Sequence, residues 1–206
     1  MAKTLKYQKD KISGYKKDLA QFSRLSYDRG LVAARGGNLS IRIPGTERVL
    51  ITPSGISLRD ITTDIIIEVD VQGNLLRGKK NLKPSKETPF HTSIYRIRSD
   101  VMAIAHVHPP FSTALSLKDK PFPIVTAPGM VNLVKVPLVE FALMGTKELC
   151  DYVSEAAKQN MEVKALLLKG HGIIGMGSDL ASAYYIADLV EDNAKVTLLS
   201  SLYRNA

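Results

Sequence analysis

The chain has 206 residues, of which 45% are hydrophobic and 23% are charged, a composition typical of globular and not of disordered proteins. An apolar run of 18 residues is absent, which excludes a transmembrane helix, and the basic N-terminus has no apolar stretch behind it that would form a signal peptide. The single cysteine, Cys150, excludes an intrachain disulfide framework and a four-cysteine zinc site. We therefore expect a soluble, cytoplasmic protein with a single domain over residues 1–206.

The net charge of +8 is distributed unevenly along the chain. Residues 1–100 carry 19 basic and 10 acidic side chains, whereas residues 101–206 carry 9 and 10. Such an excess fits a nucleic-acid surface, a membrane-surface patch or a site for a small anionic ligand. Apolar residues at helical spacing from Leu5 to Leu25 predict an amphipathic helix, and its lysines predict a solvated basic face because exposed aromatics are not interleaved with them. These lysines are Lys3, Lys6, Lys9, Lys11, Lys16 and Lys17.

Short strands with turn signals follow this helix. A glycine-containing turn at residues 35–38 leads into an alternating strand at 39–43, and a return strand is predicted at 49–52. A further strand is predicted at 65–70. Thr88 is predicted to cap a helix that has Pro89 in its first position and runs to about Ile97. The next strand, 101–107, ends at paired prolines.

The second half continues with a helix at 144–159, a strand at 165–168 and a glycine turn at 170–172. A strand at 173–176 and a helix from a cap at Ser178 and Asp179 to about Tyr203 complete the chain. Helices and strands alternate irregularly, with several hairpin-like strand pairs and without βαβ periodicity. This order favours an α/β fold with a mostly antiparallel sheet.

Three histidines are candidate metal ligands. His106 and His108 lie at i and i+2 on a predicted strand, so both imidazoles project to the same face at the strand's end. His171 lies between two glycines in a turn, a position where a histidine side chain rarely packs in the hydrophobic core. Three neutral imidazoles with an open position form the ligand set of a catalytic zinc, whereas the alternative is that backbone groups satisfy all three rings.

Glu87 is the candidate acid–base residue. It lies in a loop just ahead of a predicted helix N-terminus, where free N–H groups, Ser85 and Lys86 form a ready anion site. A carboxylate there is suited to carry a proton, although complementing the helix dipole is the alternative role. His91, four residues on, could pair with Glu87 on a metal, but we expect it to be a structural residue of the helix.

Taken together, these motifs resemble the class II aldolase/adducin family. The match extends in order and spacing over roughly residues 30–180. It consists of Gly36-Gly37-Asn38-Leu39-Ser40-Ile41-Arg42, Ile51-Thr52-Pro53-Ser54-Gly55, Lys83-Pro84-Ser85-Lys86-Glu87-Thr88-Pro89-Phe90-His91, Tyr95-Arg96 with Asp100, His106-Val107-His108-Pro109 and Gly170-His171-Gly172. Each stretch is weak evidence by itself, but the ordered set is highly specific.

The resemblance implies a fold, a metal site and a substrate class. It implies a central, mostly antiparallel sheet flanked by helices on both faces, and a homotetramer with active sites at subunit interfaces. It further implies that Glu87 is the catalytic carboxylate and that a phosphorylated sugar is the substrate. The implied zinc ligands, with one Zn²⁺ per subunit, are His106, His108 and His171. The implied phosphate-binding turns contain Gly37, Asn38, Ser54, Gly55, Ser85 and Lys86.

The implied reaction is the zinc-dependent cleavage of a ketose 1-phosphate into dihydroxyacetone phosphate and an aldehyde. Zinc would spread the charge of the enediolate that cleavage leaves, and Glu87 would move a proton to or from its carbon. Alternatives are a pentulose 5-phosphate 4-epimerase, a methylthioribulose-phosphate dehydratase and an adducin-like interaction domain. Relatives resembling the epimerase carry aspartate in place of Glu87, so glutamate favours the aldolase.

One residue departs from the aldolase pattern. That pattern has a second serine just before the catalytic glutamate, where this chain has Lys86. The lysine would face the phosphate as a charge or point to solvent, which affects substrate choice but not the metal site. Because the phosphate turns all lie in the basic half, an anionic small substrate explains the local charge better than nucleic acid, and we expect no nucleic-acid partner.

Overall fold

The computed structural model describes residues 2–118 and 120–203, with side chains from residue 10 to 202 except that of 119. Within this part, eight strands form one sheet in the order β4-β3-β2-β1-β5-β8-β7-β6. Neighbouring strands are antiparallel except β6 and β7. The strands are β1 (Asn38–Arg42), β2 (Arg48–Ile51), β3 (Ile67–Asp70), β4 (Leu75–Arg77), β5 (Ala103–Val107), β6 (Leu138–Val139), β7 (Ala165–Leu168) and β8 (Gly172–Gly177).

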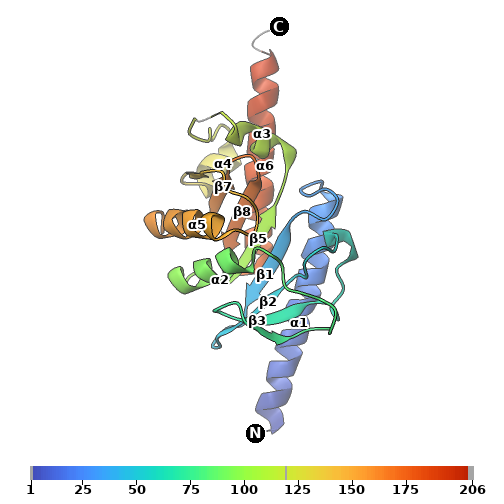
Figure 1. The fold of residues 1–206 in the computed structure, drawn as a ribbon. Coiled ribbons are helices and arrows are strands. Elements are labelled where there is room, and N and C mark those ends of the chain that lie inside the picture. Colours follow the sequence, from blue (N-terminus) through green and yellow to red (C-terminus); the bar gives the residue numbers. More distant parts are fainter. Residues whose placement is uncertain (1, 119, 204–206) are drawn as a thin grey trace.

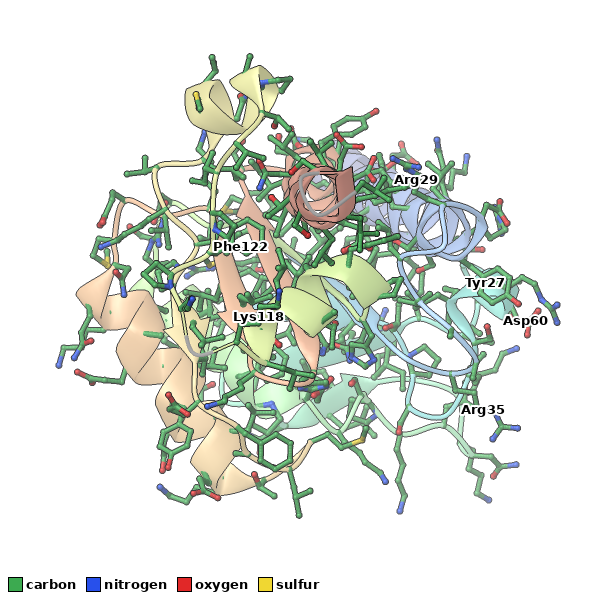
Figure 2. All side chains as sticks on the ribbon, turned by 90° about the horizontal axis from the view of Figure 1, so that it is seen from above. Tyr27, Arg29, Arg35, Asp60, Lys118 and Phe122 are labelled. Carbon is green, nitrogen blue, oxygen red and sulfur yellow. The ribbon has the colours of Figure 1, made fainter. Side chains whose placement is uncertain are left out.

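Helices cover both faces of this sheet, as Figures 1 and 2 show from two directions. The long helices α1 and α6 pack on one face, and α2 and α5 pack on the other. This arrangement confirms the predicted three-layer sandwich. The helices are α1 (Ala2–Asp28), α2 (Thr88–Ile97), α3 (Pro110–Ser116), α4 (Ala127–Asn132), α5 (Lys147–Gln159) and α6 (Leu180–Tyr203), with a 3-10 turn η1 at Leu58–Asp60.

Strand alternation divides the core into two layers. On β5, Ala103, Ala105 and Val107 face the layer under α1 and α6, whereas Ile104 belongs to the layer under α2 and α5. Because successive side chains of a strand point to opposite faces, His106 shares the face of Ile104. Its ring packs nearly perpendicular to that of Phe90 from α2, with the ring centroids 5.3 Å apart. The central strand thus carries a histidine under the α2 layer.

Helix α1 has the amphipathic character that the sequence predicts. Leu19 is fully buried, and Ile12, Tyr15 and Phe22 pack against the same core layer. Lys17 is exposed. The side chains of Leu5, Lys3, Lys6 and Lys9 lie outside the described residues. No helix in residues 2–118 and 120–203 is long and apolar enough to cross a membrane.

The sequence analysis predicted neither the 3-10 turn η1 nor two short strands and two short helices. Strand β4 has three exposed residues and β6 has only two, so neither offers a readable alternation. Helix α3 begins at Pro110, the second of the prolines that end β5, and the Glu191 carboxylate accepts hydrogen bonds from its Phe111 and Ser112 N–H groups. Helix α4 is capped by the Thr126 hydroxyl. Tertiary contacts with α6, which local patterns do not report, thus fix α3.

Candidate metal centre and substrate pocket

Two of the candidate ligands lie at the end of β5. His106 pairs with Asn38 of β1 on one side and Ile174 of β8 on the other, so both neighbouring strands hold its backbone. The Nδ1–H of its ring donates to the Ile173 carbonyl at 2.9 Å. His108 follows the strand, and its N–H donates to the Leu31 carbonyl. The two rings lie with centroids 4.6 Å apart, which agrees with the predicted projection to the same face.

His171 reaches the same place from the turn between β7 and β8. Gly170 has φ +63°, a left-handed conformation that favours glycine, and a Cβ on Gly172 would lie 2.2 Å from the Val107 carbonyl oxygen. The two glycines therefore allow the turn to approach the end of β5 closely. The His171 ring lies 4.9 Å from that of His106 and 4.6 Å from that of His108, measured between centroids.

Glu87 precedes helix α2 in the N-cap position, one residue before the predicted cap. Thr88 is the first helical residue, so the predicted Thr88 cap is wrong by one position. The Glu87 side chain does not cap the helix, because its carboxylate turns to the histidines. Oε2 lies 3.1 Å from His106 Nε2, and Oε1 lies 3.5 Å from His171 Nε2.

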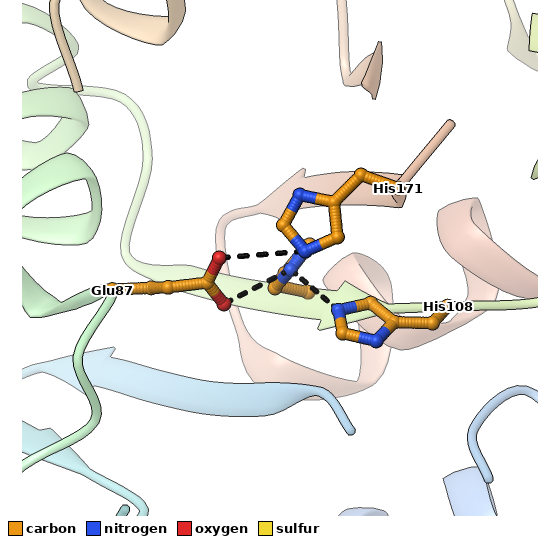
Figure 3. Close-up of side chains that lie close together, drawn as sticks. Glu87, His108 and His171 are labelled. Atoms are coloured by element: carbon orange, nitrogen blue, oxygen red, sulfur yellow. Dashed lines mark hydrogen bonds and ion pairs between the residues drawn. The ribbon is translucent and has the colours of Figure 1, made fainter. Parts of the chain in front are cut away.

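The four side chains form a donor set that fits a divalent cation (Figure 3). One ligand atom from each of Glu87, His106, His108 and His171 lies within 4.8 Å of the others. His106 uses Nδ1–H for the Ile173 carbonyl, so its Nε2 directs a lone pair at the Glu87 carboxylate and at His108 Nε2, 2.9 Å away. Oε1 of Glu87 and Nε2 of His171 are buried without a hydrogen-bond partner. A cation would satisfy these converging lone pairs together.

Burial sets the protonation states that metal binding requires. Desolvation, with a smaller contribution from the charge of His106, lowers the pKa of His108 to about 3 and that of His171 to about 4. Both rings are therefore neutral near pH 7. Burial by itself raises the pKa of Glu87, but the attraction of the carboxylate to the His106 and His171 rings and the hydrogen bond from Asn38 bring it well below its ordinary value. The carboxylate is therefore ionised.

A pocket of about 340 Å³ opens beside this cluster. All six residues predicted to bind phosphate line it, together with Glu87 and His108 from the cluster. Two exposed cationic side chains, Arg35 and Lys86, also contribute to its wall, and Figure 2 shows Arg35 at the outer edge of the molecule. The six residues are Gly37, Asn38, Ser54, Gly55, Ser85 and Lys86. Sequence reasoning missed Arg35, although it adjoins the glycine turn.

Asn38 also has a partner that the sequence did not indicate. Its Nδ2 donates to Glu87 Oε2 at 2.8 Å, and its Oδ1 lies 2.5 Å from His91 Nε2. Both nitrogens of His91 are in hydrogen bonds within the fold, in keeping with the structural role predicted for it. The Asn38 amide therefore supports Glu87 at the oxygen that also faces His106.

A larger hollow of about 650 Å³ lies at the other end of β5 and β8, against Val101, Met176 and Gly177. None of the predicted site residues lines it. Glu87 and His108 of the donor cluster line the smaller pocket together with the predicted phosphate turns. The smaller pocket is therefore the candidate substrate site.

Known proteins match this chain over most of its length. Residues 17–198 match the model of the Class II Aldolase and Adducin N-terminal domain. An L-fuculose phosphate aldolase of Methanocaldococcus jannaschii is 35% identical over 92% of this chain and 98% of its own length. A 3-oxo-tetronate 4-phosphate decarboxylase of Haemophilus influenzae is 33% identical over 86% of this chain and 84% of its own length.

A solved structure agrees with these sequence matches. The crystal structure of an L-fuculose-1-phosphate aldolase from Thermus thermophilus is 28% identical, with a TM-score of 0.82, and the match covers 93% of this chain and 96% of that chain. Fold, sequence and donor cluster thus lead to the same family. The chain belongs to the class II aldolase and adducin family, within which it is a metal-dependent lyase.

Proposed function

We propose that the protein is a Zn²⁺-dependent aldolase that cleaves a ketose 1-phosphate into dihydroxyacetone phosphate and an aldehyde. The ketose would be of the fuculose, ribulose or deoxyribulose 1-phosphate type. One observation carries this proposal: three imidazoles and a carboxylate converge beside a pocket whose other walls are glycine turns, hydroxyls and two cations. The imidazoles and the carboxylate suit the hydroxyketone end of such a substrate, and the turns, hydroxyls and cations suit its phosphate end.

His106, His108 and His171 would hold the zinc, and Glu87 would be a fourth ligand when substrate is absent. Three neutral nitrogen donors with one replaceable position suit catalytic zinc, whereas magnesium and calcium prefer oxygen donors. The bound ion would act as a Lewis acid that stabilises the negative charge developing on the substrate oxygens. The metal content of the purified protein, about one zinc per chain, tests this assignment.

Glu87 would carry the proton at the reacting carbon. Its carboxylate is ionised, so in the direction of synthesis it begins as the base that removes a proton from dihydroxyacetone phosphate. In cleavage, the C4 hydroxyl would lose its proton to solvent as the aldehyde forms, and the electron pair of the C3–C4 bond would form the enediolate. Glu87 would take up a proton from solvent and give it to C3, so that no net proton is gained or lost.

The turns at the other end of the pocket would bind the phosphate. Ser54 and Ser85 bring hydroxyls to the wall, and Arg35 and Lys86 bring positive charge. A dianionic phosphate held there would fix the register of the substrate against Glu87 and supply binding energy remote from the reacting bond.

A substrate panel tests the proposal. Ketose 1-phosphates and 5-phosphates are incubated with the zinc-loaded enzyme, and dihydroxyacetone phosphate and aldehyde are measured by coupled assays. We expect equimolar release of both products from a ketose 1-phosphate. Epimerisation of a pentulose 5-phosphate, or dehydration of methylthioribulose phosphate without either product, would contradict the aldolase and indicate one of those alternative reactions.

Lys86 favours a second candidate, the decarboxylation of a 3-oxo sugar acid 4-phosphate. A relative that is 33% identical bears the name of such a decarboxylase, and a lysine lining the pocket beside Glu87 suits a substrate carboxylate. Loss of CO₂ from C1 leaves the bonding electron pair on C2, and this gives the same enediolate of dihydroxyacetone phosphate that aldol cleavage gives. One proton added at that carbon completes the reaction.

A serine variant separates the two candidates. Lys86→Ser restores the residue of the aldolase pattern, so it should leave aldol cleavage within a few-fold if the aldolase proposal is correct. If decarboxylation is the native reaction, the same variant should lose CO₂ release by about 10-fold or more. Wild-type CO₂ release without aldehyde from any ketose phosphate would replace the first candidate by the second.

We further propose that residues 1–206 form one domain that assembles as a cytoplasmic homotetramer, with active sites at subunit interfaces. Large apolar side chains are exposed at and near Met144 of the pocket, along α4 and the segment after it, and along α6, as expected for surfaces that pack between subunits. They include Phe141, Leu143, Met144, Met130, Val131, Val134, Val196, Leu199 and Leu202. Sedimentation equilibrium should give about four times the 22.6 kDa chain mass.

A further inference from the structure

Four polar side chains behind the metal cluster form an array under helix α2. Asn38 and Ser40 lie at i and i+2 on β1, so they share the face that looks toward α2. His91 and Tyr95 lie four and eight residues after Glu87, which places all three on one side of the helix. Every second residue of the strand therefore faces every fourth residue of the helix.

Hydrogen bonds join the array into one continuous chain that ends at Glu87. The Tyr95 hydroxyl lies 2.7 Å from Ser40 Oγ, and Ser40 Oγ lies 2.7 Å from His91 Nδ1. His91 Nε2 lies 2.5 Å from Asn38 Oδ1, and Asn38 Nδ2 donates to Glu87 Oε2 at 2.8 Å. Every member except the terminal hydroxyl therefore contacts two others.

The orientation of the Asn38 amide fixes the direction of every bond in the chain. Its Nδ2 donates to Glu87, so its carbonyl oxygen faces His91. His91 must then carry its proton on Nε2 and accept at Nδ1. Ser40 consequently donates to His91 and accepts from the Tyr95 hydroxyl. All donors point one way, toward Oε2.

Burial separates this array from bulk water. Ser40 and His91 are fully buried, and the exposed fractions of Tyr95 and Asn38 are 1% and 5%. Phe90 also stacks on the His91 ring, with centroids 4.8 Å and planes 17° apart. Each polar group has its partner within the array and is sealed from bulk water, so breaking one bond leaves a buried group unsatisfied.

We propose that His91 is a positioning residue for Glu87, anchored in the core by Ser40 and Tyr95. The array holds Oε2 through Asn38 and so keeps Oε1, which has no hydrogen-bond partner, directed at the cluster and the pocket. Asn38 thereby has a second role besides the phosphate contact proposed for it. The consequence for turnover rests on the proposed function, whereas the hydrogen-bond directions do not.

Nitrogen NMR of the histidine rings tests the directions without any substrate. We expect the metal-free protein near pH 7 to show His91 as the Nε2–H tautomer and His106 as the Nδ1–H tautomer, assigned with His91→Gln and His106→Gln. The Nδ1–H tautomer at His91 would overturn the proposal, because Asn38 would then have no donor at its carbonyl oxygen.

Paired substitutions test the effect on turnover. His91→Phe keeps an aromatic ring but removes both hydrogen bonds, and we expect kcat to fall about 100-fold while KM and bound zinc stay near wild type. His91→Gln can still donate to Asn38 from its amide, so it should recover kcat to within about 10-fold of wild type. Equal losses in both variants, or a rise in KM matching the fall in kcat, would overturn the proposal.

Two further variants keep the test decisive if His91→Phe does not fold. Tyr95→Phe removes only the last hydroxyl and should lower kcat several-fold with KM unchanged. Thr92→Val is the matched control, because Thr92 is equally buried on α2 but its hydroxyl bonds only to carbonyls of its own helix. A fall in kcat for Thr92→Val equal to that for Tyr95→Phe would assign the effect to packing and overturn the role of the array.

The failure of this proposal is distinguishable from the failure of the proposed function. If the wild type turns over none of the panel substrates, the aldolase and decarboxylase candidates both fail, and the NMR measurement still decides the direction of the array. If the wild type is active and His91→Phe retains full kcat, the positioning role alone fails.

Discussion

The two faces of the central sheet carry different chemistry on the same strands. Toward α1 and α6, β1 and β5 present Leu39, Ile41 and the small side chains of β5 to an apolar layer. Toward α2, the alternate positions Asn38, Ser40 and His106 form hydrogen bonds and the candidate metal cluster. On these two strands, alternation therefore separates side chains of an apolar layer from side chains of the candidate site, although the residues are neighbours in sequence.

The separation predicts that substitutions on the two faces affect different measurements. A change on the polar face should alter metal binding and turnover more than stability. A change on the apolar face should alter the free energy of unfolding and leave the chemistry of the folded protein intact. Variants of adjacent positions on one strand are the sharpest test, since they differ mainly in the face on which the side chain lies.

The largest effect is expected for His106→Ala. It removes the proposed ligand that contacts both Glu87 and His108, so bound metal should be lost and turnover should fall at least about 1,000-fold. Metal analysis after gel filtration and the coupled assay measure the two effects. Ile104→Val, two residues earlier on the same face, is the control and should retain both. Full metal content in His106→Ala would contradict the ligand assignment.

Leu39→Ala should have the opposite signature. Leu39 is fully buried under α1 and lies between Asn38 and Ser40 in sequence. Truncating it should lower the free energy of unfolding by about 2–5 kcal/mol, because transfer energy is lost and a cavity remains. Urea unfolding measures this loss. Zinc content and kcat of the folded fraction should match wild type, and a selective loss of metal would contradict the separation of the faces.

Much of the difference between the two faces of the sheet could be predicted from the sequence. The alternation in residues 39–43, the His-x-His pair at the end of β5 and the glycines around His171 predicted both the strands and the converging imidazoles. The hydrogen-bonded array was not predicted, because it joins β1 to α2 across 51 residues and depends on a register that no local pattern contains. The Glu87 cap position was missed by one residue because the carboxylate binds histidines instead of the helix.

Gly36→Ala should weaken metal binding without removing a ligand. A Cβ at this position would lie 2.7 Å from His108 Nδ1, so the ring must shift from its present position in the cluster. We expect zinc affinity to fall about 10- to 100-fold, as when the support of a metal ligand is disturbed. Competition with a chelator measures the affinity. Gly78→Ala is the matched control, since its nearest neighbour would be an Ile67 side-chain atom at 3.4 Å. Unchanged affinity in Gly36→Ala would contradict the close contact.

The metal-free protein should lose stability as the pH falls below about 6.5. His108 and His171 have pKa values of about 3 and 4 when folded, against 6.5 as the ordinary value, so the unfolded chain takes up protons that the folded chain does not. The free energy of unfolding should therefore decrease by up to about 1.4 kcal/mol per pH unit for each such histidine between pH 6.5 and about 4.

Urea unfolding in EDTA at several pH values measures this dependence. His171→Gln removes one of the titrating groups, so its stability should depend less steeply on pH than that of the wild type. An identical slope in the two proteins would show that His171 titrates alike in both states, and the burial of the polar face would then not be the cause of the acid sensitivity.

The smallest effect is expected on the apolar side of the molecule, at Gly14 within helix α1. A Cβ there would have nothing within 4 Å, and glycine inside a helix costs about 0.5–1 kcal/mol relative to alanine because its unfolded state has more backbone freedom. Gly14→Ala should therefore raise the free energy of unfolding by that amount in urea melts, with kcat and zinc content unchanged. Since α1 packs against the face opposite the metal cluster, a change in zinc affinity would mean that the two faces are coupled through the sheet.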